Sequence, residues 1–269
     1  MRAWYLECGP EDVAERAILV GDPGRTDLFA ERMEDVRVVA ENRGLRTITG
    51  SYDGTPVTVC AFGMGAPVAV IVLEELAQLG VRTALRAGTV MTLSPEPLGE
   101  LIVASGTVRQ ESTSAGYLAP SFPALPDADL LFTTLVELER RRLPHRVGLV
   151  ASLDVFYGQM LAKEPHQRPA VASRLSRLAD GGAIAVDMET SAILAAARRL
   201  EIRAGSVCLG SVDGSNGVRL DDERRVKGEE NLAQVALAAI AAPEGELLRA
   251  VRERAEAPAR PELADGKER

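Results

Sequence analysis

Arginine, glycine and threonine occur together in the segment Arg86-Ala87-Gly88-Thr89. The preceding residues 81–85 come directly after Gly80 and predict a buried strand that ends where the polar residues begin. A guanidinium donates two parallel hydrogen bonds to an oxyanion, and a glycine lets backbone N–H groups approach the same anion. The segment is therefore a candidate phosphate site, although the same residues also fit a strand end whose arginine forms a salt bridge.

Two more arginines stand at polar corners upstream. The apolar run 17–20 is followed by Gly21, and Arg25 comes just before a helix predicted from about residue 26 to residue 33. Because a helix N-terminus stabilises anions, Gly21 and Arg25 are candidates for the same phosphate. Arg43 lies in a polar corner between two predicted strands.

Carboxylates and hydroxyls follow two further apolar runs. Asp187 and Glu189 follow one, and Ser211 and Asp213 follow the other. In open α/β sheets ligands bind beyond the carboxyl ends of the strands, so we expect these residues near the arginines. A carboxylate can accept hydrogen bonds from both hydroxyls of a vicinal diol such as a ribose. The alternative is that Asp187 and Glu189 only stabilise the start of a helix predicted at residues 192–200.

Other chemistries have weaker support in the sequence. Gly63 and Gly65 follow a strand as in a dinucleotide fingerprint, but Val68 occupies the place of its third glycine, which disfavours a nicotinamide cofactor. The two histidines, His145 and His166, lie in polar, proline-flanked surroundings and are expected at the surface. The absence of a G-x-S-x-G elbow and of a Walker A loop disfavours an α/β-hydrolase and a nucleoside triphosphatase.

Composition limits the class of protein. The 269 residues are 46% hydrophobic and 26% charged, which fits one large globular domain. A net charge of −8, with scattered lysines and arginines, argues against a nucleic-acid partner. Cys8, Cys60 and Cys208 are far apart, which predicts no disulfide, no metal site and a reduced, cytoplasmic setting. No apolar stretch reaches the roughly 18 residues of a membrane helix, so we expect a soluble protein without a membrane partner.

Strands alternate with helices along the chain. This alternation predicts an α/β fold, a single domain with a mixed, mostly parallel central sheet flanked by helices. We expect the domain to span residues 1–255 and the tail 256–269 to be disordered. Further strands are predicted at residues 36–40, 48–52, 57–62, 101–105, 147–151, 183–186 and 205–209, and further helices at residues 68–79, 128–142, 221–241 and 244–254.

The ordered set of segments resembles the hexameric-type nucleoside phosphorylases, the family of uridine phosphorylase, bacterial purine nucleoside phosphorylase and archaeal methylthioadenosine phosphorylase. The similarity extends from about residue 13 to residue 241, and its blocks are residues 13–25, 41–44, 74–80, 86–89 and 186–192. The resemblance implies a pentosyltransferase that cleaves the N-glycosidic bond of a nucleoside with inorganic phosphate. The products would be the free base and (deoxy)ribose 1-phosphate, and no cofactor would be needed.

The resemblance also implies roles for single residues. Arg86 would be catalytic, and Asp213 is a candidate proton donor to the base. Arg43 would be lent to the phosphate site by the neighbouring subunit of a homodimer that assembles into a homohexamer. The phosphate would be held by Gly21, Arg25, Arg43, Arg86, Gly88 and Thr89, and the nucleoside by Tyr5, Met64, Phe156, Gln159, Asp187, Met188 and Glu189.

The sequence departs from the family pattern on the side of the base and the 5′ end. Tyr5 stands where the family often has histidine, and Val90 and Met91 replace small residues after Thr89. Gln159 lacks the arginine that follows two residues later in uridine phosphorylases. An extra residue separates Asp213 from the serine that precedes it in the purine enzymes. We therefore expect phosphorolysis with an unusual or relaxed base preference.

Two other functions fit part of the pattern. A hydrolytic nucleosidase shares the expected fold but has no use for three arginines at a phosphate site. A non-catalytic nucleoside-binding protein would explain the bulk of Val90 and Met91, and it predicts binding without turnover. A cofactor-dependent oxidoreductase has the least support, because the glycine fingerprint is incomplete.

Overall fold

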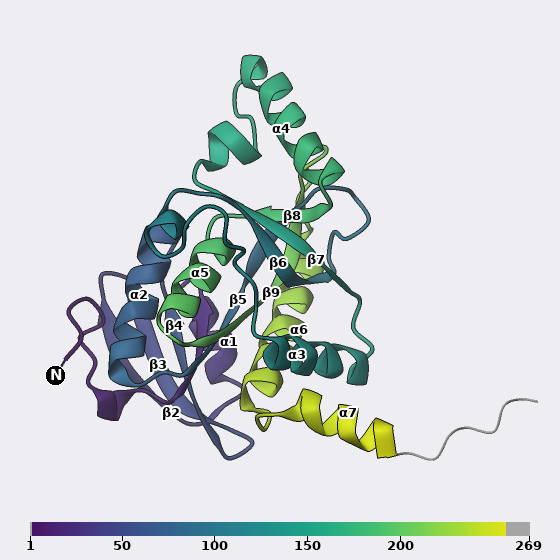
Figure 1. Ribbon diagram of the computed structural model, residues 1–269. Coiled ribbons are helices and arrows are strands. Elements are labelled where there is room, and N and C mark those ends of the chain that lie inside the picture. The colour runs from purple at the N-terminus through teal and green to yellow at the C-terminus, as the bar shows by residue number, and fades with distance from the viewer. Residues whose placement is uncertain (1, 257–269) are drawn as a thin grey trace, which may run out of the picture.

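The most buried strands form the middle of one mixed sheet. In the computed structural model, which describes residues 2–256, β1 (Arg16–Val20) lies between β4 (Thr55–Ala61) and β5 (Thr83–Thr92), and all three run parallel (Figure 1). These strands consist almost entirely of buried residues. Strands covered on both faces need such continuous apolar runs rather than alternation.

The sheet has nine strands in the order β2-β3-β4-β1-β5-β8-β7-β6-β9. Because β9 also pairs with β5, the strands β5, β8, β7, β6 and β9 close into a ring. Five of the nine pairings are parallel, so the prediction of a mixed, mostly parallel sheet is confirmed. The remaining strands are β2 (Glu34–Asn42), β3 (Leu45–Tyr52), β6 (Leu101–Gln110), β7 (His145–Leu153), β8 (Ala183–Asp187) and β9 (Arg203–Asp213).

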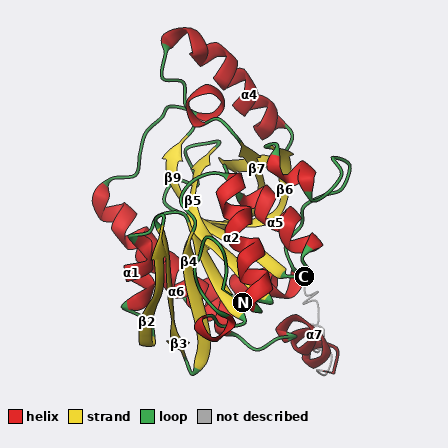
Figure 2. Cartoon of the chain, turned by 90° about the vertical axis from the view of Figure 1, so that its left-hand side faces the viewer, coloured by secondary structure: helices red, strands yellow, loops and turns green. Residues whose placement is uncertain are grey.

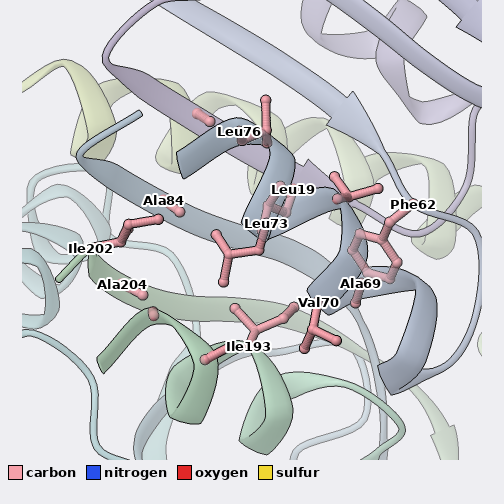
Figure 3. Close-up of a cluster of buried hydrophobic side chains, with 14 of the residues drawn as sticks. Leu19, Phe62, Ala69, Val70, Leu73, Leu76, Ala84, Ile193, Ile202 and Ala204 are labelled. Carbon is pink, nitrogen blue, oxygen red and sulfur yellow. The ribbon is translucent and has the colours of Figure 1, made fainter. Parts of the chain in front are cut away.

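Helices cover the sheet on both sides. One hydrophobic cluster packs α2 (Ala66–Leu79) and α5 (Thr190–Arg199) on the strands, with the side chain of Leu73 between Leu19 and Ile193 (Figure 3). The other side carries α1 (Arg25–Ala30), α3 (Ala128–Arg140) and α6 (Asp222–Ala241). Figure 2 shows α1 and α2 on opposite sides of the strands. Helix α4 (Arg168–Asp180) projects from the body, and α7 (Glu246–Glu256) ends the described chain (Figure 1).

Several strands extend further than the apolar runs predict, and for β5 and β9 the difference affects the candidate site. β5 continues through Arg86, Gly88 and Thr89 to Thr92, and β9 continues to Asp213, because the two strands pair along their whole length. The predicted end of the strand at residue 85 is therefore wrong. The polar residues of the first candidate site lie within the sheet, not in a loop after it.

Other differences are local. Helix α1 ends at Ala30 rather than near residue 33, and neither α4 nor the π-helical turn η3 (Phe156–Met160) was predicted. Of the tail predicted at 256–269, only Glu256 is described, as the last residue of α7, and residues 257–269 lie outside the described residues. None of the helices within residues 2–256 is long and apolar enough to cross a membrane.

Candidate active site

A cavity of about 530 Å³ gathers most of the predicted site residues. Its walls come from the segments that follow β1 and β4, from β5 and β9, from the turn η3 and from the end of β8. The predicted residues that line it are Gly21, Arg25, Met64, Arg86, Gly88, Thr89, Phe156, Asp187, Met188 and Glu189.

Arg86 is the buried centre of the cavity wall. Its Nη2 lies 2.6 Å from Oε2 of Glu189 and 3.1 Å from Oδ2 of Asp187. Its Nη1 donates to Sγ of Cys208, and its Nε has no partner among the described residues. Burial opposes the positive charge, but Cys208, Asp187 and Glu189 together raise the pKa of Arg86, so the guanidinium stays protonated. Burial also raises the pKa of the Cys208 thiol, against the effect of Arg86.

Gly88 makes room for this guanidinium. A Cβ at Gly88 would overlap the side chain of Arg86, which folds back along β5 beside it. Gly88 is opposite Cys208 in the pairing of β5 with β9, so both strands pack against the same arginine. The glycine predicted for anion binding therefore also sets the position of the cationic group.

Glu189 lies where it can meet a sugar. Its Oε1 accepts the backbone N–H of Gly65 at 2.7 Å, and its Oε2 accepts from Arg86. Gly65 has a φ of 97°, a conformation that side chains disfavour, so this N–H is presented by a residue that needs to be glycine. Each carboxylate oxygen can accept a second hydrogen bond, which leaves Glu189 able to bind a diol in the cavity.

Asp187 has a different role from Glu189. Its Oδ1 accepts from Oγ of Ser152 at 2.6 Å, and its Oδ2 accepts from both the backbone N–H and the hydroxyl of Thr190, the first residue of α5. Together with the ion pair to Arg86, these bonds occupy its oxygens. Asp187 therefore positions Arg86 and α5. Neither of its carboxylate oxygens is free to accept a hydrogen bond from the nucleoside, as the predicted contact would require.

Arg25 brings the second cationic group to the cavity. It is the first residue of α1, and its Nη2 lies 3.1 Å from Oε1 of Glu229 on α6. Glu229 also pairs with Arg225 at 3.2 Å. Arg25 could therefore bind an anion in the cavity while Glu229 keeps Arg225 as a partner. Glu229 is 204 residues away from Arg25 in sequence, and no local pattern could have indicated the pair.

Two predicted residues, Tyr5 and Arg43, lie outside the cavity lining of their own chain. The guanidinium of Arg43 is 5.6 Å from the centre of the Tyr5 ring, and Nδ2 of Asn42 donates to the Tyr5 carbonyl at 2.8 Å. Arg43 is exposed in the turn between β2 and β3. The two residues are 38 positions apart in sequence but form one pair at the surface.

Gln159 and Asp213 do not line the cavity either. The side-chain oxygen of Gln159 accepts the backbone N–H of Val155 at 3.0 Å. Oδ1 of the buried Asp213 accepts the backbone N–H of Ser215 at 2.9 Å and its hydroxyl at 2.7 Å. The geometry therefore gives no support to Asp213 as proton donor or to Gln159 as a reader of the base.

Nine lining residues were not among the predicted site residues, namely Asp22, Pro23, Gly63, Val90, Met91, Met160, Val186, Ser211 and Val212. Met160 comes from η3, Asp22 follows β1, and Val212 lies near the end of β9. Met160 adjoins the predicted Gln159, but only the π-helical turn decides which of the two faces the cavity. Within residues 2–256, no group of three or more His, Cys, Asp or Glu side chains is arranged to hold a metal ion.

Comparison with known proteins gives one consistent result. Residues 15–241 match the family model described as the phosphorylase superfamily. The guanosine phosphorylase of Halorubrum lacusprofundi is 36% identical over 82% of this chain and 89% of its own. The uridine phosphorylase of Thermococcus kodakarensis is 32% identical over 88% of this chain and 85% of its own.

Solved structures agree with these relatives. The crystal structure of uridine phosphorylase from Vibrio fischeri in complex with 6-hydroxy-1-naphthoic acid has a TM-score of 0.79 at 30% identity, and the match covers 89% of this chain and 96% of that one. The purine nucleoside phosphorylase of Toxoplasma gondii in complex with immucillin-H has a TM-score of 0.80 at 25% identity, with 89% and 95% covered.

Proposed function

The chain belongs to the phosphorylase superfamily, and from this premise we propose that it cleaves the N-glycosidic bond of a nucleoside with inorganic phosphate. The products are the free base and ribose 1-phosphate or its deoxy counterpart, so the protein is a pentosyltransferase. One observation carries the proposal: two arginines and the carboxylate of Glu189 line a single cavity large enough for a nucleoside beside a phosphate.

The cationic part of the cavity is the proposed phosphate site. Arg25 and Arg86 supply charge and parallel N–H donors, and Thr89 supplies a hydroxyl from the same wall. We assign Gly21 and Gly88 to the same site, because both line the cavity and Gly88 leaves the space that the Arg86 guanidinium occupies. We assign inorganic phosphate as co-substrate and no other cofactor.

The ribose lies between this phosphate and the base. As the glycosidic bond lengthens, C1′ and the ring oxygen take on oxocarbenium character. Phosphate below the sugar is then both counter-ion and nucleophile, and the arginines fix its position before the reaction. Glu189 accepts hydrogen bonds from the 2′- and 3′-hydroxyls and Met188 packs on the sugar, which holds C1′ above the attacking oxygen.

The third arginine of the site comes from a second copy of the chain. Arg43 is exposed and lies against Tyr5, outside the cavity of its own chain. In a homodimer that assembles further into a homohexamer, Arg43 would reach the phosphate of the neighbouring subunit and Tyr5 would reach the 5′ end of its nucleoside. We place this assembly in the cytoplasm, in nucleoside salvage.

Product analysis tests the proposal. The purified protein is incubated with guanosine, inosine, uridine and adenosine, with and without phosphate, and free base and sugar products are measured by chromatography. We expect base release that depends on phosphate and yields ribose 1-phosphate. Release of free ribose without phosphate would show a nucleosidase instead, and binding without any release would show a nucleoside-binding protein.

A further inference from the structure

One end of the cavity is almost purely apolar. Met91, Met160 and Val212 belong to one hydrophobic cluster with Phe156 and Met188, and all five line the cavity together with Val90. Val90, Met91 and Met160 are at most 4% exposed. In the proposed reaction this end receives the base, because the arginines and Glu189 occupy the other end.

No carboxylic acid faces this apolar end among the described residues. The carboxylates in the cavity lining are Asp22, Asp187 and Glu189. Asp187 and Glu189 are paired with Arg86, and Asp22 accepts the backbone N–H of Gly24 at 2.9 Å in the corner after β1. Each of the three is thus committed to the phosphate and ribose side.

The two side chains that sequence predicts for the base are turned away from it. Gln159 is bonded to the backbone of Val155, and Asp213 is bonded twice to Ser215. Neither lines the cavity. The one side-chain hydroxyl at this end in the described lining, Ser211, donates to the Val90 carbonyl at 3.4 Å. The base would therefore touch mainly thioethers, an aromatic ring and aliphatic side chains, which pack on the faces of a flat heterocycle rather than bonding to its edge.

From this arrangement, and resting on the proposed function, we propose that the protein selects nucleosides by how readily the base departs without a proton from the protein. The substrate class comprises nucleosides whose base leaves as a stabilised anion, such as guanosine and uridine, or as a neutral molecule from a cationic nucleoside. Cytidine, whose base is a poor anion, is outside this class. Because an apolar pocket discriminates weakly between shapes, purine and pyrimidine nucleosides both enter it.

The step balances without an acid from the chain. The C1′–N bond breaks with its electron pair moving to the base nitrogen, and a lone pair of a phosphate oxygen forms the C1′–O bond. The departing base anion takes up a proton from water, and the proton of monohydrogen phosphate is released to water, so the products are neutral base and dianionic ribose 1-phosphate. A nucleoside already methylated at N7 of guanine carries a positive charge, and its base departs neutral.

Two matched pairs of nucleosides test the inference on the unaltered protein. With saturating inorganic phosphate, kcat/KM is measured for 7-methylguanosine against guanosine and for 5-fluorouridine against uridine, and cytidine is measured beside uridine. Since a positioned general acid typically contributes at least about 100-fold, we expect 7-methylguanosine to exceed guanosine by about that factor. We also expect 5-fluorouridine to exceed uridine several-fold, because fluorine makes uracil a better anion at little cost in size.

The possible results distinguish a failure of the inference about the base from a failure of the proposed phosphorolysis. Ratios near one in both pairs would overturn the inference, because they would show that the protein protonates the base, and the proposed phosphorolysis would stand. If none of the four nucleosides releases base in the presence of phosphate, the proposed function itself fails and the inference falls with it. A large ratio in the first pair with fast cytidine turnover would also overturn the proposed substrate class.

Discussion

Arg86 is the residue on which the proposed chemistry depends most. It is 4% exposed, and its guanidinium is held by Asp187, Glu189 and Cys208 rather than by solvent. We expect Arg86→Lys to lower kcat/KM by about 100-fold to 1,000-fold, because an ammonium cannot replace the fork of parallel donors and one lost donor in a preorganised site has this effect. Steady-state kinetics with varied phosphate measures it. Arg82→Lys is the control, since Arg82 is exposed just before β5.

Gly88 offers a test of how the arginine is placed. We expect Gly88→Ala to raise KM for phosphate and lower kcat, because a methyl group there displaces the Arg86 guanidinium. Gly116→Ala is the matched control, since a Cβ at Gly116 would meet no atom within 4 Å. Phosphate titration of both variants provides the measurement, and equal kinetics in the two would contradict the proposed crowding at Gly88.

A substitution at Asp213 tests whether its carboxylate is catalytic or structural. Asp213→Asn retains the oxygen that accepts both bonds from Ser215, so the strand end is preserved. We expect kcat/KM for guanosine to equal that of the wild type within error. If Asp213 were the proton donor, guanosine turnover would fall by about 100-fold or more, while 7-methylguanosine would be spared.

At the scale of elements, Asp187 ties β8 to the start of α5 and to Arg86 in β5. We expect Asp187→Ala to lower the free energy of unfolding by about 3 kcal/mol, because it leaves a buried charge and a helix start with fewer partners. Denaturant unfolding followed by circular dichroism measures the change. Asp180→Ala, at the exposed end of α4, is expected to have little effect, and equal losses in both variants would refute the special role of Asp187.

Most elements could be predicted from the sequence, because apolar runs bounded by glycine or turn residues mark them. The end of β5 could not be predicted, since Arg86 and Gly88 look like a loop until Asp187 and Glu189 neutralise the arginine inside the sheet. Helix α4 could have been found, because Val171, Leu175 and Leu178 are spaced for one helical face.

The candidate site, too, could be predicted from the sequence only in part. The predicted residues of the cationic end do line one cavity, because β1 and β5 run parallel with Leu19 paired to Arg86, which places the residues after β1 beside the middle of β5. The orientation of Gln159 and Asp213 could not be predicted, since it depends on hydrogen bonds to Val155 and Ser215 that the residue types do not reveal. The proposed roles in phosphate and nucleoside binding remain predictions.

At the scale of the whole molecule, the proposed dimer makes each active site depend on two chains. We expect Arg43→Ala to raise KM for phosphate although Arg43 does not line the cavity of its own chain. Co-expression of Arg43→Ala with Arg86→Ala should restore part of the activity that each variant lacks alone, because a mixed dimer contains one site with all three arginines. Absence of any recovery in isolated mixed dimers would argue against a shared site.

The ion pair between Arg86 and Glu189 also has a consequence for how the two substrates affect each other's binding. At rest, the group assigned to phosphate and the group assigned to ribose satisfy each other. The first substrate to bind competes for its own group and weakens this pair, so the partner of the second substrate is then held less strongly. Each substrate should consequently tighten the binding of the other by the same factor, as thermodynamic linkage requires.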